Sequence, residues 1–366
     1  MKKIKKILQS SFKFFFYKLF ILLYGKISNK ISSEKDSRIK IDTIKEKNNL
    51  SYKIYKIVNG RLYTDRVHDT AIILENCIVE GPSYQLRNVD NAKVEENIVF
   101  KKGTPRIKKN LKGKVLSLLT GGAGNDNYWH WLFDVLPRIA LYEKVSDIEK
   151  IDFFLLPSLE KQFQKDTLDL LKISKKKLIS SKHFRHISCP ELFVTDHPYV
   201  IDDASKDIQN IPNWIFEWLR NKYINQETKN ETNLPKKIYI DRSDSSSNTK
   251  NLRLITNEEE IKKFLENKGF RSIALGNFHF KEQVKFFNNA EIVVGLHGAG
   301  FGNLCFCKPK TKVVELKMNT DGKVIENLAI NNGLIYKSII CEALKYKMAQ
   351  FGHINVSLDS LKKIVE

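Results

Sequence analysis

Alternating strand and helix patterns in the second half of the chain constrain its fold most strongly. Helical spacing at 256–267, where Thr256 and Glu259 form a capping box, at 281–289 and at 324–330 separates the apolar runs. Those runs are the five predicted strands, at 238–240, 270–275, 292–294, 313–314 and 334–340. Such alternation is typical of a parallel sheet with helices on both faces. The sequence therefore predicts a doubly wound α/β domain after a polar boundary at 226–236.

A glycine-rich loop at 295–300 interrupts this alternation directly after a buried strand. Glycines let the backbone approach an anion, and a helix opening near Ala299 would direct free N–H groups at that anion. His297 could add a donor, and Glu315 at the end of the next strand could accept hydrogen bonds from a ribose. The loop predicts a nucleotide diphosphate site; the alternative is that its glycines serve tight packing.

The first half of the chain begins with β-rich patterns and continues as α/β. Short apolar runs at 54–58, 71–74, 97–100 and 114–119 predict strands, and a strand at 153–156 precedes a helix at 163–171. Residues 32–50 have the composition of a linker. We therefore divide the chain into a basic aromatic segment with linker (1–45), an N-terminal acceptor-side α/β domain (46–228) and a C-terminal Rossmann-like domain (229–366).

The N-terminal segment combines basic and aromatic residues. The first 40 residues hold eleven Lys or Arg and two acidic residues, so they supply +9 of the net charge of +20. The apolar run at 19–24 is too short to span a membrane, and no small-residue cleavage site follows it. We expect residues 1–30 to contact anionic lipid, which would place the protein in the cytoplasm at the inner face of the cell membrane. The alternatives are a helix packed on the body of the protein or an uncleaved signal anchor.

Neither the cysteines nor the acidic residues indicate a metal. The five cysteines are scattered without zinc-ligand spacing and fit cytosolic thiols, and no Asp-x-Asp motif follows an apolar strand. Asp202-Asp203 and the pair of Asp241 and Asp244 are the nearest candidates. We expect no metal and no cofactor. The sequence is basic but contains no recognisable nucleic-acid-binding motif, so we expect no nucleic-acid partner.

A second unusual segment, residues 127–138, follows the strand at 114–119 through a glycine turn. In a helix starting near Asp126, His130 and Asp134 are four positions apart and share one face. A carboxylate beside an imidazole raises its basicity, as a general base requires. Pro137 ends or restarts the helix. The alternative is a His–Asp pair on a helix surface.

Taken together, several motifs in this order resemble glycosyltransferase family 61, which includes bacterial capsular polysaccharide biosynthesis proteins and eukaryotic O-GlcNAc and xylose transferases. They are residues 127–138, residues 238–242, Arg253 with Asn257 and Glu258, residues 295–303 and residues 313–316. The resemblance covers roughly residues 50–345. It implies an inverting transferase of the GT-B kind, with two Rossmann-like domains facing a cleft, and the missing Asp-x-Asp motif predicts that this transferase is metal-independent. The donor would be a nucleotide sugar carrying a hexose or pentose, and the acceptor a hydroxyl of a surface polysaccharide or lipid-linked glycan.

The resemblance also implies roles for individual residues. His130 and Asp134 would be catalytic, either of them being the base, and Arg242 would neutralise the departing diphosphate. Asp241 stands where members often carry a small residue. The other expected donor contacts are His297, Gly298, Ala299, Gly300, Asn303 and Glu315, and further candidates are Asn127, Arg138 and Arg253.

Two other functions are compatible with parts of the sequence. A non-catalytic basic protein on a degenerate transferase fold, binding anionic lipid or nucleic acid, would account for the net charge of +20. A hydrolase using His130 and Asp134 has less support, because no Gly-x-Ser-x-Gly elbow and no Cys–His pairing indicate a nucleophile.

Overall fold

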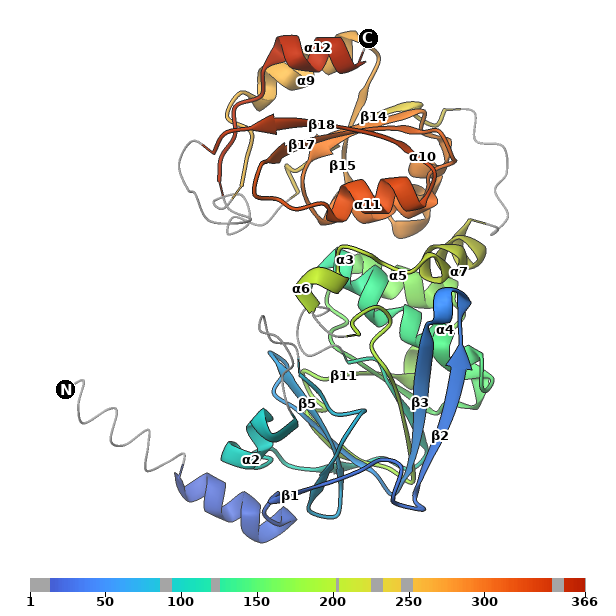
Figure 1. Cartoon of the computed structure of the whole chain (residues 1–366), viewed down its shortest axis with the longest axis vertical. Helices are drawn as coiled ribbons and strands as arrows, with labels where there is room; N and C mark the ends of the chain where they lie inside the picture. Colours follow the sequence, from blue (N-terminus) through green and yellow to red (C-terminus); the bar gives the residue numbers. More distant parts are fainter. Residues whose placement is uncertain are drawn as a thin grey trace, which may run out of the picture. The chain divides into compact units, whose positions relative to one another are not determined.

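The structure is a computed structural model, which describes residues 14–85, 94–119, 126–201, 204–224, 233–244, 253–343 and 352–365 (Figure 1). The chain forms two compact units, one of residues 1–160 with 173–204 and the other of residues 161–172 with 205–366. The chain therefore enters the second unit, returns to the first and crosses again. The boundary predicted at 226–236 lies largely outside the described residues, and the units divide between residues 204 and 205.

The second unit contains the predicted parallel sheet, in the order β15-β14-β16-β17-β18. Every neighbouring pair in this order is parallel, which confirms the five predicted strands. Buried Val, Ile and Leu side chains make up most of β16 and β17, as expected of strands covered on both faces. The strands are β14 (Lys237–Asp241), β15 (Arg271–Ala274), β16 (Ile292–Leu296), β17 (Lys312–Met318) and β18 (Ile335–Cys341).

Helices cover both faces of this sheet (Figure 1). On one face, α9 (Glu258–Asn267) and α12 (Leu358–Val365) contribute Ile261, Leu265 and Leu361 to a core shared with the strands. On the other lie α10 (Phe280–Asn289) and α11 (Val324–Asn331). The unit also contains α5 (Gln162–Leu170), α7 (Asn213–Tyr223) and, apart from its first residue, α6 (Ala204–Asp207). The doubly wound prediction is confirmed for this unit.

The first unit contains two sheets. One has the order β11-β10-β9-β13-β3-β2, in which β11, β10, β9 and β13 are parallel and β3 and β2 are antiparallel. Its strands are β2 (Ile39–Lys45), β3 (Ser51–Val58), β9 (Lys114–Ser117), β10 (Phe153–Leu156), β11 (Leu178–Ser180) and β13 (Glu191–Thr195). The α/β character of both units is therefore established.

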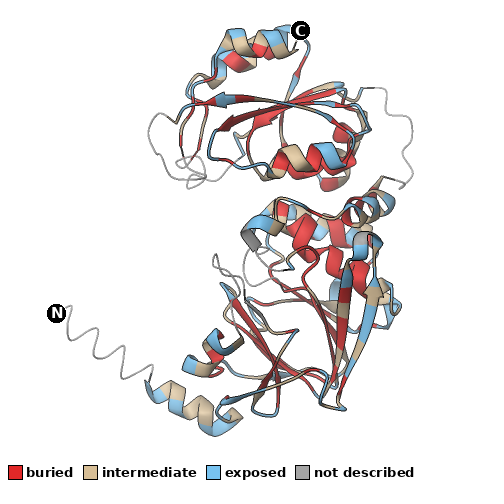
Figure 2. Ribbon diagram, viewed as in Figure 1, coloured by how far each residue is buried: buried red, intermediate tan, exposed pale blue. Residues whose placement is uncertain are grey.

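The other sheet has the order β1-β6-β5-β4-β12-β8, with β7 on β5. Buried side chains of both sheets, such as Ile72 and Leu74 from one and Val115 and Leu155 from the other, form a common core (Figure 2). The strands of this second sheet are β1 (Asn29–Ile31), β4 (Arg61–Thr64), β5 (Asp69–Leu74), β6 (Cys77–Val79), β7 (Tyr84–Gln85), β8 (Lys109–Asn110) and β12 (His186–Ser188). Short 3-10 turns connect elements at η1 (Lys47–Asn49), η2 (Val94–Glu96), η4 (Ile148–Lys150), η5 (Lys175–Lys177) and η6 (Leu275–Asn277).

Two predictions for the first unit are wrong. The apolar run at 97–100 is not a strand but the start of α2 (Ile98–Lys102), because Asn97 caps it by accepting from the Val99 N–H at 3.2 Å. The stretch at 32–50 is not an open linker. Isoleucines recur at nearly alternate positions in this stretch, as in a strand with one buried face. Part of it therefore forms β2, an edge strand antiparallel to β3.

A helix over residues 14–24 begins the described part of the chain. No helix among the described residues is long and apolar enough to span a bilayer.

Candidate functional site

The first candidate site lies where the connection order of the first unit's parallel strands reverses. From β9 the chain adds β10 and then β11 on one side, whereas β13 pairs on the other side of β9. In open α/β sheets, ligands bind outside the carboxyl ends of the strands at such a switch point. Residues 126–138 follow β9, and His197 follows β13.

The helix after β9 changes its hydrogen-bond pattern to accommodate Pro137. It starts as α3 (Tyr128–His130), widens to a π-helical turn over Trp131–Val135 and continues as α4 (Pro137–Glu143). Proline lacks an N–H, and its ring clashes with the carbonyl four residues earlier. The backbone hydrogen bonds of this turn therefore join residues five apart instead of four. The Leu136 N–H, for example, donates to the Trp131 carbonyl oxygen at 3.1 Å. Of the two predicted outcomes, that Pro137 ends the helix or restarts it, the structure shows the restart.

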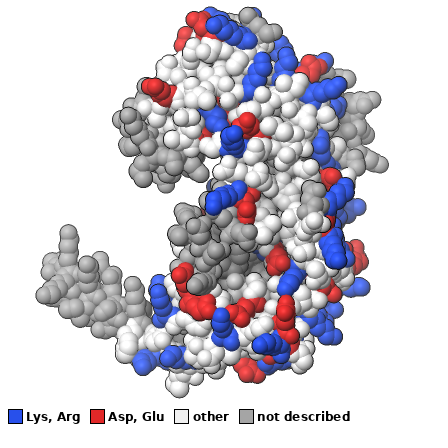
Figure 3. All heavy atoms as spheres, in the orientation of Figure 1, with Lys and Arg blue, Asp and Glu red and all other residues white. Residues whose placement is uncertain are grey.

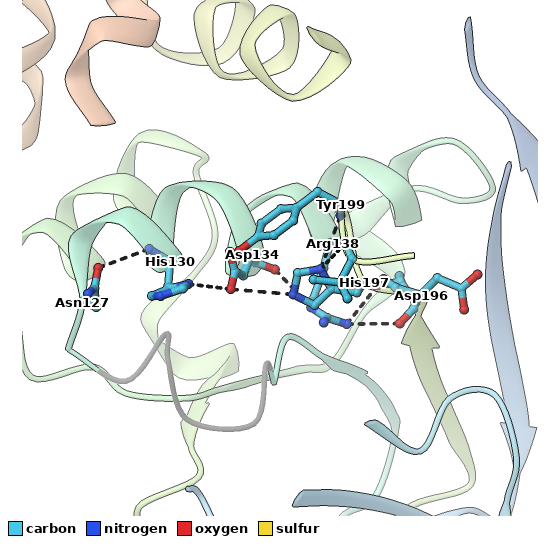
Figure 4. Close-up of polar contacts among 9 residues, drawn as sticks. Asn127, His130, Asp134, Arg138, Asp196, His197 and Tyr199 are labelled. Atoms are coloured by element: carbon cyan, nitrogen blue, oxygen red, sulfur yellow. Dashed lines mark hydrogen bonds and ion pairs between the residues drawn. The ribbon is translucent and has the colours of Figure 1, made fainter. Parts of the chain in front are cut away.

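This helix brings His130 and Asp134 together (Figure 4). The His130 Nδ1 lies 2.8 Å from Asp134 Oδ2; the His130 side chain is 21% exposed and the Asp134 side chain only 1%. Burial alone would raise the pKa of Asp134, but the charge and hydrogen bond of His130, helped by His197, hold it far below its usual range. Burial alone would lower the pKa of His130, and the Asp134 carboxylate outweighs that effect and raises it. Asp134 therefore stays ionised and orients a more basic His130.

His197 is a member of this cluster that sequence reasoning missed. Its Nδ1 accepts from the backbone N–H groups of Tyr199 and Val200 at 3.3 and 3.0 Å, so the proton of the neutral ring sits on Nε2. That atom lies 3.6 Å from Asp134 Oδ2 (Figure 4). Burial lowers the pKa of His197, which keeps the ring neutral at pH 7. The available signal was a histidine just after the apolar run of β13.

Asn127 and Arg138 hold the helix in place. Asn127 Oδ1 accepts from the N–H groups of Trp129 and His130 at 2.9 and 3.4 Å and thereby caps α3. Arg138 is 2% exposed, and its guanidinium donates to the backbone oxygens of Asp134 and Thr195, each at 3.1 Å. Asn127 and Arg138 therefore position the helix that carries His130 and Asp134.

The second candidate site lies at the switch point of the second unit's sheet. The order β15-β14-β16 places the ends of β14 and β16 side by side, so Arg242 after β14 meets His297 after β16. Arg242 Nη1 lies 3.4 Å from the His297 carbonyl oxygen. No carboxylate of the described residues forms an ion pair with Arg242. A positive group at this position is suited to binding an anion.

The loop glycines differ in what they do. A Cβ at Gly300 would lie 2.9 Å from Leu275 Cδ1, and one at Gly295 would lie 3.0 Å from the Ile240 Cβ, so these two allow close packing. A Cβ at Gly298 would have Arg242 Nη1 among its nearest atoms, at 3.7 Å. The helix predicted near Ala299 is present as the 3-10 helix η7 (Ala299–Phe306). Gly295 and Gly300 therefore serve packing, whereas Gly298 leaves room beside Arg242.

Glu315 is fully buried on β17 and contacts protein groups with both carboxylate oxygens. His297 Nδ1 contacts Oε1, and the Tyr336 hydroxyl donates to Oε2, which also lies 3.7 Å from Lys317 Nζ. Burial, followed by the charge of Glu315, raises the pKa of Tyr336 far above its usual range. In this structure Glu315 therefore orients His297 and does not present its carboxylate to solvent, contrary to the expectation of a direct ribose contact.

Two further predicted residues are held by the protein. Arg253 donates to the His297 carbonyl oxygen at 2.8 Å and to Asp321 Oδ1 at 2.7 Å. Asn303 is fully buried and donates to Gln283 and to the Gly300 carbonyl at 3.2 and 3.3 Å. These contacts fix the loop on which Gly298 and His297 lie.

The acidic residues considered as metal ligands have other partners. Asp241 lies 3.0 Å from Lys262 Nζ and accepts from the Ser243 N–H, while Asp244 accepts from the Gly276 N–H. Asp202 and Asp203 lie outside the described residues. Among the residues that are described, no group of His, Cys, Asp and Glu has the arrangement of a metal site.

Both units are α/β, and each candidate site lies at the carboxyl ends of parallel strands, where open α/β sheets bind ligands. The family model described as Glycosyltransferase 61 matches residues 128–314, just over half of the 366 residues. The chain therefore belongs to glycosyltransferase family 61, which implies a sugar donor and a glycan acceptor in general terms. The match begins just before His130 and ends just before Glu315. Among curated proteins, none matches the chain.

Proposed function

We propose that the protein is an inverting glycosyltransferase in which His130 is the general base and Arg242 receives the leaving diphosphate of a nucleotide sugar. The observation that carries this proposal is the His130–Asp134 pair. Asp134 is buried and ionised, so it cannot reach a substrate, whereas His130 is partly exposed and made more basic by it. The acceptor would be a hydroxyl of a surface polysaccharide or lipid-linked glycan.

The proposed reaction is a single displacement. The acceptor oxygen forms a bond to the anomeric carbon as its proton passes to His130 Nε2, because Nδ1 is occupied by Asp134. The bond between the anomeric carbon and the diphosphate breaks on the opposite side, and the electron pair leaves with the diphosphate. Attack opposite the leaving group inverts the anomeric configuration. The reaction requires the donor on the second unit to come within reach of His130, as in a GT-B enzyme.

In the second unit we assign direct diphosphate contact to Arg242, to the loop at 298–300 and to Nε2 of His297. Glu315 acts through His297 because its carboxylate is enclosed by His297, Tyr336 and Lys317. Arg253 and Asn303 position the loop. Positive protein groups would then stabilise the departing charge without a metal ion.

Donor binding can be tested by thermal shift of the full chain with a panel of nucleoside diphosphates and nucleotide sugars. A nucleotide that binds only the native state raises the Tm. Arg242→Ala should abolish that shift, while Arg271→Ala, which removes an exposed arginine of the same unit, should keep it. No shift with any nucleotide, and no hydrolysis of any nucleotide sugar, would contradict the proposal.

His130→Ala tests the chemical step. We expect kcat to fall roughly 10²- to 10⁴-fold, as when a general base is removed, with donor binding unchanged. His68→Ala removes an exposed histidine of the same unit and should leave kcat unchanged. Turnover of His130→Ala at the wild-type rate would exclude His130 as the base. A non-catalytic basic protein would show no transfer in any variant.

A further inference from the structure

A groove of about 1020 Å³ lies in the first unit, between the helix at 14–24 and two segments distant in sequence. The helix supplies aromatic side chains to its wall, and the segments at 101–109 and 182–185 supply mainly basic ones. The lining aromatic residues are Phe14, Phe16, Tyr17 and Phe20, and the lining basic residues are Lys101, Lys102, Arg106, Lys109, Lys182 and Arg185. Aromatic and cationic side chains thus share one concave surface.

The carboxyl end of the helix at 14–24 is fixed to the body of the unit through Tyr24. The Tyr24 hydroxyl accepts from the Lys108 N–H at 3.0 Å, its carbonyl accepts from Arg61 at 3.0 Å, and its ring packs edge-on against His186 at 4.9 Å. Phe20 stacks on Tyr24 one turn earlier, with ring centroids 5.9 Å apart. One face of the helix is therefore packed on the body of the first unit, which is one of the alternatives considered for the N-terminal segment.

The other face of this helix is apolar and exposed. Phe14, Phe15, Leu22 and Leu23 are 57% to 84% exposed, and Ile107 beside the groove is 75% exposed. Residues three or four apart share a helix face, so Phe15, Leu22 and Leu23 lie away from the side of Phe20 and Tyr24. Lys18 shares the face of Phe14 and Leu22 and is also exposed, and exposed apolar side chains grouped around a cation mark an interaction site.

The basic residues of the groove retain their charge for a ligand. Lys101, Lys102, Arg106 and Lys109 are exposed, and within the described residues no carboxylate forms an ion pair with any of them. Lys182 pairs with the exposed Glu160. Figure 3 shows basic side chains along the lower left, over the N-terminal helix and the adjoining part of the unit. The groove therefore attracts anions.

We propose that this groove and the exposed face of the helix at 14–24 bind a membrane surface containing anionic phospholipid. The lysines and arginines contact headgroup phosphates, while Phe14, Phe15, Leu22 and Leu23 enter the boundary between headgroups and acyl chains. Charge complementarity selects the anionic lipid. The aromatic rings alone would also suit a nucleic acid, but the exposed Leu22 and Leu23 offer no ring on which a base could stack and are suited to the acyl boundary, so we assign the surface to a membrane. The basic segments at 101–109 and 182–185 extend the membrane contact well beyond the predicted residues 1–30.

The test is sedimentation of the full chain with vesicles of phosphatidylcholine alone or mixed with phosphatidylglycerol. We expect binding to the mixed vesicles that weakens with salt. Lys101→Gln with Lys102→Gln should weaken it roughly 30-fold, because each lysine near an anionic surface contributes about 1 kcal/mol. The matched control, Lys175→Gln with Lys176→Gln, removes the same charge from the same unit outside the groove and should bind like the wild type.

Leu22→Ser with Leu23→Ser tests the apolar part and should also weaken binding, with the charge unchanged. Circular dichroism and Tm of each variant would verify that the fold is intact. Equal binding to both vesicle types, or equal losses in the groove and control variants, would overturn the proposal. So would tighter binding to a single-stranded oligonucleotide than to the mixed vesicles, which would assign the groove to nucleic acid.

Discussion

At the scale of single residues, the structure separates groups that can touch a substrate from groups that hold them. His130 and Arg242 are partly accessible, whereas Asp134, Glu315 and Asn303 are fully buried. The four-residue spacing predicted the pairing of His130 with Asp134, which the structure shows, but it could not assign such roles. Burial depends on side chains from other elements, such as Tyr336 on β18 and His297 after β16 around Glu315.

The pH dependence of transfer should report the coupling between His130 and Asp134. The base works when unprotonated, so activity should rise with pH through a His130 pKa that lies above its ordinary value. In Asp134→Asn the opposing charge is lost and burial remains, so the acid limb of kcat/KM should move to lower pH while kcat falls. A pH–rate profile measures this, and an unmoved limb would show that another group titrates.

A glycine-to-alanine pair should separate binding from packing in the loop at 295–300. Gly298 has extended backbone, with φ 166, and an added Cβ would meet ordinary contacts at 3.7 Å, so Gly298→Ala should fold with an unchanged Tm. Its methyl would lie beside Arg242 and weaken nucleoside diphosphate binding about tenfold, or ~1.4 kcal/mol. Gly300→Ala should instead lower the Tm, because its Cβ crowds Leu275. Isothermal titration and thermal unfolding distinguish these outcomes.

At the scale of secondary structure, the periodicity of apolar residues predicted the repeated strands and helices. Two predictions failed at helix starts, where hydrogen bonds to nearby side chains decide which residue begins the helix. The central strands β14, β16 and β17 follow the predicted runs because their apolar stretches are buried on both faces, whereas the edge strands β15 and β18 are only partly buried. Thr256 does not cap α9 as predicted, since its hydroxyl donates to the Ile354 carbonyl and the helix begins after Asn257. Asn97 likewise turned an apolar run into α2. Such caps depend on partners that a sequence window does not contain.

The cap at Asn127 should matter to both stability and catalysis, because it begins the helix that carries His130. Asn127→Ala leaves the Trp129 and His130 N–H groups without their acceptor and should lower the free energy of unfolding by about 1 kcal/mol. Asn127→Ser keeps an acceptor and should retain most of that stability. Urea titration measures both variants; equal losses would show that the cap contributes little.

At the scale of the whole chain, composition predicted two units of ordinary size, and the resemblance predicted the family. No sequence pattern indicated that residues 161–172 belong with residues 205–366. That assignment comes from α5, whose Asp166 accepts from the Phe280 N–H at 2.9 Å and pairs with His279 at 3.1 Å, and whose Thr167 carbonyl accepts from Tyr223. Contacts over such sequence separations leave no local pattern.

Removing this contact should therefore weaken the second unit although Asp166 lies between segments of the first. Asp166→Ala should destabilise by about 1–2 kcal/mol and speed amide hydrogen exchange at the start of α10. Asp169→Ala, an exposed position on the same helix, is the matched control and should leave exchange there unchanged. Faster exchange confined to the first unit would contradict the division of the chain.

The return of the chain between its two units also sets an order of folding during synthesis. The α5 segment leaves the ribosome before residues 173–204 complete the first unit, but α10, which Asp166 contacts, follows roughly a hundred residues later. At about 5–20 residues per second, that interval lasts on the order of ten seconds. Until α10 emerges, Asp166 on α5 lacks that partner, so the nascent chain exposes part of an amphipathic helix to chaperones.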